Sequence, residues 1–593
     1  MKQRLSLLVK LCIALLIGAG CAVYAPFAPF QASVLTAVSF LLMGGAGFLL
    51  TFGLEGRLHR RLLRFTLPLS FFLSLSFVLG AQLQVYGMLR FRPITAITLA
   101  GLWALWFFIL CHLFVTVPAW LKPRHPQKKL HSTTLLWAVC AAFCVLAASW
   151  LLAFYPIMTN YDIHAHLLQL VNGQYETHHS LLYTLLMQGL LSLSSALGLT
   201  NAWAFLVLGL LQMAVMAASI GYGLVTLNNA GADRRAVLAA AVYYCVFPLF
   251  GYFAFSTTKD TLFACFLLLT AVELYRLATQ STGLRGMVRL AVFAVLACLM
   301  RYNGTAALLL LFAVFAIAAL YHVIKRTKFP VIVRRMLLLL PVILLLSTGA
   351  GSLLSTVTGA VTPDTVSRDM LSLPLQQMAR VLQTAEDETD TARIRGLFGV
   401  EDIRERYRPD IADPVKAAFL YPDENVANAL RAWLKLGVSY PRAYLEAFLE
   451  LTRGAWFVDD LSHTKIDFWL DYTGYLETTQ KYQEEAIPIR YQTFVPALRT
   501  FWENAFMENR YLNVPLLRYL FALAVQAWIP LIALCYAAYH RRRGAGYLPL
   551  FALCVLLPLL LLPCMISRYF LPLFLLNPLC LLGLTAHKES PAA

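Results

Sequence analysis

Long apolar runs alternate with short polar connections along most of this chain. A membrane-crossing helix needs about 20 consecutive, mainly apolar residues, and fourteen runs come close to that length. The runs lie at 5–25, 32–54, 66–88, 97–121, 134–155, 203–227, 236–254, 261–279, 286–300, 305–323, 336–354, 515–539, 547–563 and 569–586. The first is too long for a cleaved signal segment and is interpreted as a membrane helix. The pattern predicts an all-α polytopic membrane protein.

The distribution of Lys and Arg predicts how these helices are oriented. Basic residues near membrane helices gather on the cytoplasmic side. Here they occupy alternate connections, beginning with Lys2 and Arg4 and ending with Arg541 to Arg543. The alternation holds only if 180–198 does not cross the membrane, so this segment is expected to be an amphipathic helix at the outer interface. Both termini are then cytoplasmic.

Composition narrows the class of protein further. The 593 residues are 60% hydrophobic and 13% charged, which is too apolar for a water-soluble fold. The formal net charge of +17 does not indicate a nucleic-acid partner, because the bases lie in short clusters between apolar runs. Membrane lipids are the partners expected. The 12 cysteines lie mainly within apolar runs and are interpreted as small core residues.

One large polar region interrupts the apolar pattern. Residues 355–513 hold 24 of the 31 acidic residues, together with several Trp and Tyr residues. They predict a folded, largely helical extracytoplasmic domain. The domain division expected is an N-terminal four-helix extension (1–133), a core (134–354) with its first extracytoplasmic loop at 156–200, the domain at 355–513 and C-terminal helices (514–593).

The candidate chemistry lies at the predicted outer ends of the apolar runs. Ionisable groups at a membrane boundary are costly to place and are functional candidates. Asp162 stands out, since acids are scarce outside 355–513. It could deprotonate a nucleophile as a general base, or it could cap the helix that follows it.

Histidines surround Asp162 in the sequence. His164 and His166 are two residues apart, so on a helix they would point to different faces. With Glu176 they could hold a divalent cation such as Mg²⁺, Mn²⁺ or Zn²⁺. The alternative is that the histidines, including His178 and His179, donate hydrogen bonds to a phosphate or a sugar.

Two further groups are expected on the same face. Lys259 and Asp260 could form a local ion pair, or Lys259 could contact a phosphate that Asp260 orients. Arg301 and Arg568 lie at apolar helix ends, where they could extend to the interface or bind the phosphate of a lipid head group.

These motifs together resemble the GT-C superfamily of membrane glycosyltransferases. Asp162 matches the catalytic Asp of their first large loop, and His179-Ser-Leu-Leu-Tyr183 resembles their His-Pro-x-x-Tyr element, with Ser180 in place of Pro. Thr258-Lys259-Asp260 and Arg301-Tyr-Asn303-Gly304 resemble the ends of two later spans. More narrowly, the chain resembles the bacterial DUF6020 type, whose Ser-x-Pro-x-Gln-Gln-x-Ala-Arg motif here reads Ser372-Leu-Pro374-Leu-Gln376-Gln377-Met-Ala-Arg380.

The resemblance implies a GT-C-like bundle of about 14 transmembrane helices in a bacterial inner membrane. It implies an inverting hexosyl- or pentosyltransferase that moves a sugar from a polyprenyl-phosphate carrier to a cell-envelope glycan or lipid acceptor. Asp162 would be the base. The substrate and its lipid phosphate would be bound by Lys259, Asp260, Arg301, Asn303, Arg568, His178, His179, Tyr183, Gln376, Gln377 and Arg380. The alternatives are a transporter or flippase of a lipid-linked or anionic solute, and a non-catalytic envelope-assembly protein.

Overall fold

The fold is described from a computed structural model of the full chain. The structure describes residues 6–586 except 25–32, 53, 55, 122–128, 161, 281, 364–369, 386, 401, 421–422, 461–486, 488 and 515. Within these residues every regular element is a helix, and strand-like pairing is limited to isolated bridges. The expectation of an all-α architecture is therefore confirmed.

Twelve of the fourteen apolar runs each fall on one helix. The run at 236–254 is divided between α9 (Arg234–Val246) and α10 (Pro248–Ala254), and the run at 515–539 between α23 (Leu517–Phe521) and α24 (Leu523–His540). Nine helices of the described residues are long and apolar enough to cross a membrane, or ten if the bent pair α9–α10 counts as one span. The shorter ones include α25 and α26, so the predicted number of 14 spans is not established. The bend of 53° between α9 and α10 falls at Pro248, whose ring cannot continue the preceding helix.

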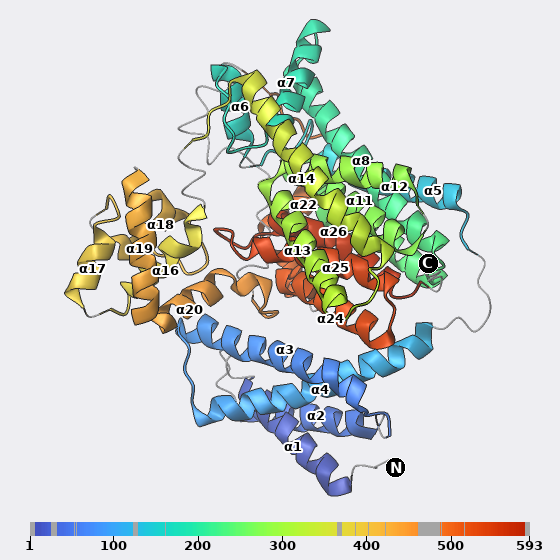
Figure 1. Ribbon diagram of the computed structural model, residues 1–593, viewed down its shortest axis with the longest axis vertical. Helices are drawn as coiled ribbons and strands as arrows, with labels where there is room; N and C mark the ends of the chain where they lie inside the picture. The colour runs from blue at the N-terminus through green and yellow to red at the C-terminus, as the bar shows by residue number, and fades with distance from the viewer. Residues whose placement is uncertain are drawn as a thin grey trace.

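The first four helices form a unit of their own at the lower end of Figure 1. Within it α1 packs against α2 and α4, and α3 packs against α4. These helices are α1 (Leu7–Tyr24), α2 (Ser33–Phe52), α3 (Arg60–Tyr86) and α4 (Pro93–Leu121).

The remaining apolar helices form a bundle around α11 and α26, which are its most enclosed members. Helix α11 contacts α8, α12, α25 and α26, and nearly all of its residues are buried. The bundle consists of α5 (Ser132–Ala153), α8 (Asn201–Asn229), α9 (Arg234–Val246), α10 (Pro248–Ala254), α11 (Lys259–Thr279), α12 (Leu284–Met300), α13 (Tyr302–Ile324), α14 (Val331–Thr358), α24 (Leu523–His540), α25 (Tyr547–Leu559) and α26 (Ser567–Gly583).

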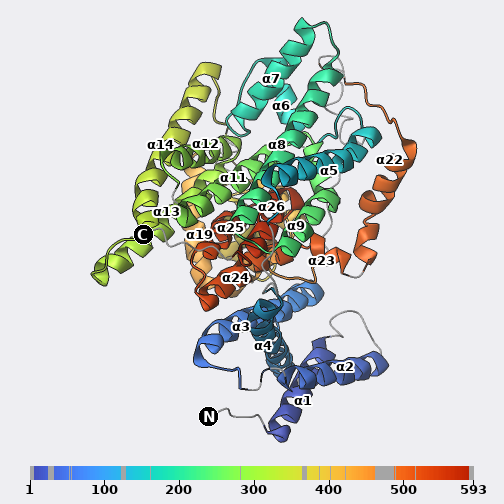
Figure 2. The same ribbon diagram turned by 90° about the vertical axis from the view of Figure 1, so that its right-hand side faces the viewer.

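Two short helices connect α5 to α8. They are α6 (Ile163–Asn172) and α7 (Leu181–Ala196), and α7 packs along α8 (Figure 2). Helix α7 begins at Ser180, whose hydroxyl accepts a hydrogen bond from the Tyr183 amide at 3.2 Å. It covers the segment expected to be an interfacial helix.

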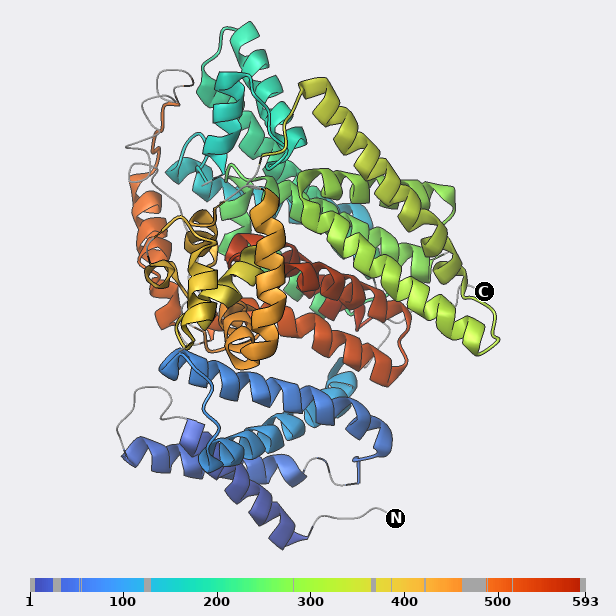
Figure 3. The same ribbon diagram turned by 60° about the vertical axis from the view of Figure 1, so that its left-hand side comes forward.

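The polar region folds around a second, smaller hydrophobic core that includes Leu375, Met378, Val415 and Leu436. Figure 3 shows its helices at one end of the bundle, opposite the connections 325–330 and 541–546. We call this the domain end of the bundle. Its helices are α16 (Ser372–Val381), α17 (Glu388–Arg395), α18 (Asp413–Ala417), α19 (Asp423–Ser439) and α20 (Pro441–Leu451). Two later short helices pack on the bundle instead: α22 (Pro496–Trp502) on α5, and α23 (Leu517–Phe521) on α24.

A buried ion cluster joins three bundle helices at the other end. Glu273 of α11 is fully buried and lies 3.1 Å from both Arg276 Nη1 and Arg289 Nε of α12. The hydroxyl of Tyr222 on α8 also donates a hydrogen bond to Glu273. One carboxylate thus pairs with two guanidinium groups between apolar helices.

We expect Glu273→Gln to lower the stability of the bundle. Removing one partner of a buried ion pair leaves uncompensated charge and costs about 3–5 kcal/mol, but Arg276 and Arg289 keep some exposure, so about 2–3 kcal/mol is expected here. The thermal midpoint of the purified protein measures it. The matched control is Glu508→Gln, which breaks an exposed pair with Arg510; equal midpoints for the two variants would refute the role of Glu273.

Candidate functional site

The site lies at the domain end, where the beginnings of several helices converge. Asp162 precedes α6, Ser180 precedes α7, Thr258 precedes α11, Arg301 precedes α13 and Ile566 precedes α26. A helix N-terminus carries partial positive charge and unpaired backbone N–H groups, so it favours anions. The backbone alone therefore creates a positive potential in this region.

Short backbone pairings hold two segments that are distant in the sequence side by side. The Met158 amide donates to the Phe255 carbonyl at 2.8 Å, and the Thr257 amide donates to the Met158 carbonyl at 2.9 Å. These two bonds hold the chain before α6 beside the chain before α11. The carboxylate of Asp162 and the amine of Lys259 are thereby placed next to each other.

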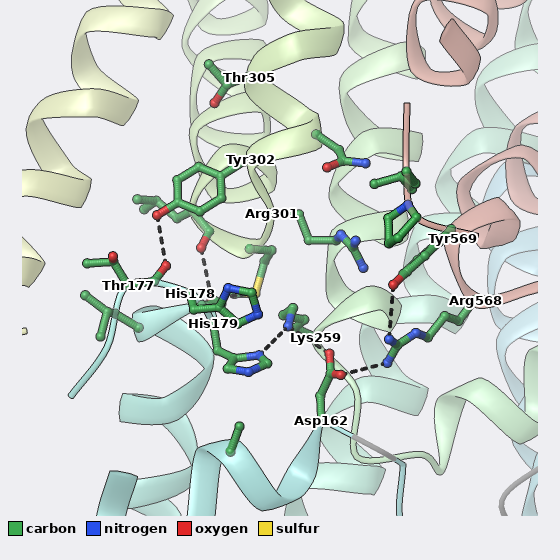
Figure 4. A pocket seen from close by; sticks show the side chains of 18 of the residues that line it. Asp162, Thr177, His178, His179, Lys259, Arg301, Tyr302, Thr305, Arg568 and Tyr569 are labelled. Carbon is green, nitrogen blue, oxygen red and sulfur yellow. Dashed lines mark hydrogen bonds and ion pairs between the residues drawn. The ribbon is translucent and has the colours of Figure 1, made fainter. Parts of the chain in front are cut away.

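Five charged side chains form one connected network, of which Figure 4 shows Asp162, Lys259, Arg301 and Arg568. Lys259 Nζ lies 2.9 Å from Asp162 Oδ2, and Arg568 Nη1 lies 3.0 Å from Asp162 Oδ1. Arg301 pairs with Asp260, and Arg568 Nε lies 3.9 Å from the other oxygen of Asp260. Three cations therefore share two carboxylates, which leaves one positive charge in surplus.

Neutral groups complete the network. Lys259 Nζ also lies 3.0 Å from Nδ1 of His179. Arg568 donates to Asn160 Oδ1 at 3.1 Å and to the Tyr569 hydroxyl at 3.3 Å. The ring of Tyr569 lies 4.6 Å from the guanidinium carbon of Arg301 and 5.0 Å from that of Arg568. Such contacts hold guanidinium groups in place without neutralising them.

The surrounding charges keep Asp162 ionised. Burial alone would raise the pKa of its carboxyl group, but the positive charges of Arg568 and Lys259 outweigh burial and hold the pKa well below its ordinary value. In this arrangement Asp162 is a carboxylate with low proton affinity.

Two histidines beside the network are neutral at pH 7. Burial, reinforced by the charge of Lys259, lowers the pKa of His166 to about 3 and that of His179 well below its ordinary value. His166 Nδ1 lies 2.7 Å from the Thr184 hydroxyl, and its ring lies 5.2 Å from that of His179. Neutral His179 can accept the hydrogen bond from Lys259.

These depressed pKa values predict acid sensitivity between about pH 6.5 and pH 4. There the unfolded chain binds protons on both histidines while the folded protein does not, so stability rises with pH and falls on acidification. The loss is up to about 1.4 kcal/mol per pH unit for each group. We expect the thermal midpoint to fall from pH 7 to pH 5, and His166→Gln to flatten that slope. Exposed His59→Gln is the control; an unchanged slope in His166→Gln would contradict the assignment.

A cavity of about 1820 Å³ opens beside the network. Asp162, Lys259, Arg301 and Arg568 reach it from one side. From the polar domain it is lined by Asp410 and by Lys416, which pairs with Asp413 at 2.7 Å. The Ala412 amide donates to the Pro563 carbonyl at 2.8 Å, which fixes α18 over the segment before α26. The polar domain therefore covers the cavity, and it has room for a sugar-sized or larger ligand.

The structure brings most of the predicted site residues to this cavity. It is lined by Asp162, His164, His178, His179, Lys259, Arg301, Asn303 and Arg568. Asp260 lies behind them and holds the two arginines. Tyr183 is buried, with its hydroxyl 3.1 Å from Gln212, so it supports the site from within the fold.

Three residues that the sequence predicted to lie at the cavity do not line it. Gln377 donates to the Tyr444 carbonyl at 3.1 Å, and Gln376 donates to the carbonyl of Arg408. Arg380 pairs with Glu446 at 2.8 Å and donates to the carbonyl of Gly87 in the α3–α4 connection. Helix α16 is buried inside the polar domain, and its polar side chains bond within that domain and, through Arg380, to the α3–α4 connection.

The proposed cation ligands are not brought together either. No group of three or more His, Cys, Asp or Glu side chains with the geometry of a metal site occurs among the described residues. His164 lines the cavity and His166 is packed behind it, while Glu176 pairs through its backbone with Val361 at the end of α14. The two network carboxylates face Lys and Arg. This donor set does not fit a divalent cation.

The sequence did not single out Asn160 or the ring of Tyr569 as site residues. Asn160 lies two residues before Asp162, and Tyr569 follows Arg568. This closeness in sequence to predicted site residues is the feature that could have identified them. Their roles depend on contacts between segments about 400 residues apart, such as Asn160 with Arg568.

The fold and the site together define a class: an all-helical protein, compatible with several membrane passes, with a large cavity beside a buried ion network at one end of its bundle. The chain belongs to the family of unknown function DUF6020, whose model matches residues 155–593. The match begins just before Asp162 and leaves α1–α5 outside it. A comparison with curated proteins and with solved structures finds no match.

Proposed function

We propose that this protein is a membrane glycosyltransferase that transfers a sugar from a polyprenyl-phosphate carrier to a cell-envelope acceptor. The observation that best supports this proposal is the ion network beside the large cavity. In it Lys259, Arg301 and Arg568 share two carboxylates, which leaves one surplus positive charge. A guanidinium group matches phosphate oxygens with two parallel hydrogen bonds. The resemblance to the GT-C superfamily supports the choice of a lipid-linked phosphate.

The positions of the basic connections between helices support a site that faces the outside of the membrane. Clusters such as 325–335 and 541–543 lie at the end of the bundle away from the polar domain. By the positive-inside rule that end is cytoplasmic. The cavity and the polar domain then lie on the outer face of a bacterial inner membrane, where an envelope acceptor is available.

In the reaction proposed, an acceptor hydroxyl oxygen attacks the anomeric carbon of the donor sugar. The hydroxyl proton passes to Asp162, and the bond from the anomeric carbon to the phosphate oxygen breaks with its electron pair on that oxygen. Polyprenyl phosphate leaves with one more negative charge than the donor carried. Lys259, Arg301 and Arg568 stabilise that charge as it develops.

The ion pairs give a reason for Asp162 to act only after the donor is bound. Without an anion, Lys259 and Arg568 both point at Asp162 and suppress its proton affinity. A phosphate that takes over these two cations removes that effect, so the pKa of Asp162 rises toward a range in which it can accept a proton. Neutral His179 keeps a contact with Lys259 throughout the change.

The direct experiment is transfer by the purified full-length protein in lipid nanodiscs. A labelled sugar on polyprenyl phosphate is supplied together with a membrane-envelope extract, and release of polyprenyl phosphate coupled to labelled product is measured. Label that stays on the carrier with every sugar tested, hexose and pentose alike, would contradict the proposal. Movement of intact carrier between leaflets, without cleavage, would favour the flippase alternative.

A further inference from the structure

The cavity extends from the charged network along the apolar helices. Beyond Arg301 its wall is formed by Cys298 and Leu299 of α12 and by Thr305 of α13. The facing wall is one side of α14, where Ser347, Gly351 and Ser355 follow one another at intervals of four residues. Side chains at this spacing share a helix face. We call this part of the cavity, between α12–α13 and α14, the slot.

Several hydroxyl groups on the α14 wall already donate hydrogen bonds within the protein. Ser347 donates its hydroxyl proton to carbonyls of its own helix, with Ile343 at 2.9 Å. Thr348 donates to Leu344 at 2.7 Å, and Ser355 donates to Ala360 at 3.2 Å. Because these hydroxyl protons are already used, this wall suits a hydrocarbon chain better than a sugar, whose hydroxyl groups need partners.

The slot opens sideways on an apolar surface. Thr348 and Ser352 of its wall are exposed, and the neighbouring side chains of Leu345 and Leu353 are 74% and 64% exposed. Exposed leucines on a candidate span face lipid once the helix lies in a bilayer. An occupant of the slot would therefore come from the hydrocarbon region of the bilayer.

At the domain end the slot is closed by a strap. The Tyr302 hydroxyl donates to the Thr177 carbonyl at 2.9 Å, and the Thr177 hydroxyl donates to that of Thr362 at 3.0 Å. The Val361 amide also donates to the Tyr175 carbonyl at 3.0 Å. These bonds tie the connection before α7 to the end of α14. A chain lying in the slot can therefore enter from the side, below the strap.

We propose that the slot holds the hydrocarbon chain of a lipid phosphate whose head group is bound by Lys259, Arg301 and Arg568. The surplus positive charge selects an anionic head, and the slot continues from it into the apolar surface between α13 and α14. This inference rests on the proposed function for the identity of the lipid, but its geometry is independent of any transfer step.

Two glycines of α14 provide a matched test. A Cβ on Gly351 would meet only Leu299 Cδ2, at 4.0 Å, so Gly351→Leu is compatible with the fold and fills the slot. A Cβ on Gly349 meets nothing within 4 Å, and Gly349 does not line the cavity. Gly349→Leu therefore adds the same side chain to the same helix outside the slot.

Binding is measured on the full-length protein in nanodiscs with long-chain polyprenyl phosphate, geranyl phosphate and phosphatidic acid. Since each buried methylene group contributes about 0.8 kcal/mol, we expect Gly351→Leu to weaken the long-chain lipid at least about tenfold. Geranyl phosphate, whose short chain leaves most of the slot empty, should change by less than about twofold. Gly349→Leu should change neither, and equal thermal midpoints establish that both variants fold.

Each outcome decides the inference. A Gly351-specific loss for polyprenyl phosphate or phosphatidic acid supports the slot, and a loss confined to phosphatidic acid keeps the slot but contradicts the proposed donor. Equal effects of the two substitutions, or an equal loss for geranyl and long-chain phosphates, overturn the inference. In that case the transfer assay still decides the proposed function by itself.

Discussion

Asp162→Asn is expected to abolish sugar transfer while leaving lipid-phosphate binding intact or stronger. The amide cannot accept a proton, and loss of a general base costs about 10²–10⁴-fold in rate. The same change removes one of the two carboxylates that compete with phosphate for Lys259 and Arg568. A lower transfer rate with equal or higher lipid affinity would point to this network, because disruption of the fold would lower both the rate and the affinity.

The measurement pairs the initial rate of transfer with the dissociation constant for polyprenyl phosphate. Glu508→Gln, which removes an exposed carboxylate in a surface ion pair, serves as the control and should leave both values unchanged. If Asp162→Asn retains the full rate, another group accepts the proton. If it loses lipid binding instead, Asp162 has a structural role.

Arg568→Gln is expected to have the second-largest effect, this time on both binding and rate. Arg568 contacts Asp162, Asp260, Asn160 and Tyr569, so its guanidinium group is held in position for an anion. Removing one donor that stabilises developing charge costs about 10²–10³-fold in rate. Weaker polyprenyl-phosphate binding should accompany that loss.

The conservative variant Arg568→Lys separates charge from geometry. Lys keeps the positive charge but loses the two-pronged donor arrangement, so an intermediate loss is expected. Arg541→Gln, in the connection between α24 and α25 at the opposite end of the bundle, is the matched control. Wild-type affinity in Arg568→Gln would exclude this residue from the phosphate site.

The sequence predicts the helices well because the apolar runs determine them. Twelve of the fourteen runs each fall on one helix, and the run at 236–254 is broken at Pro248, as the chemistry of proline requires. Helix length is harder to anticipate. Helices α25 and α26 have 13 and 17 residues, and their ends depend on packing against α24 and α11.

The candidate site was predicted as a set of residues but not as a network. Lys259 and Asp260 could have paired with each other, yet they pair with Asp162 and Arg301 respectively. These partners are separated by 97 and 41 positions. The bridge between Met158 and Ser256 and the hydrogen bond from the Asn160 amide to the Thr257 hydroxyl bring the first pair together. Pairing across such distances depends on the tertiary fold.

The error at α16 has a different cause. Gln376, Gln377 and Arg380 are polar residues in a distinctive motif, which favoured a place at the cavity. In the structure they are buried. Their partners come from the polar domain, as Glu446 does, and from the α3–α4 connection, as Gly87 does. A buried polar group must be hydrogen-bonded wherever it lies, so polarity alone did not distinguish a ligand site from an internal network.

The most direct test is the structure of the full-length protein with polyprenyl phosphate bound. We expect the phosphate within hydrogen-bond distance of Lys259 and Arg568, the Asp162 ion pairs opened, and the hydrocarbon chain leaving between α13 and α14. A phosphate bound elsewhere, with the contacts of 2.9 Å and 3.0 Å to Asp162 still intact, would contradict this expectation.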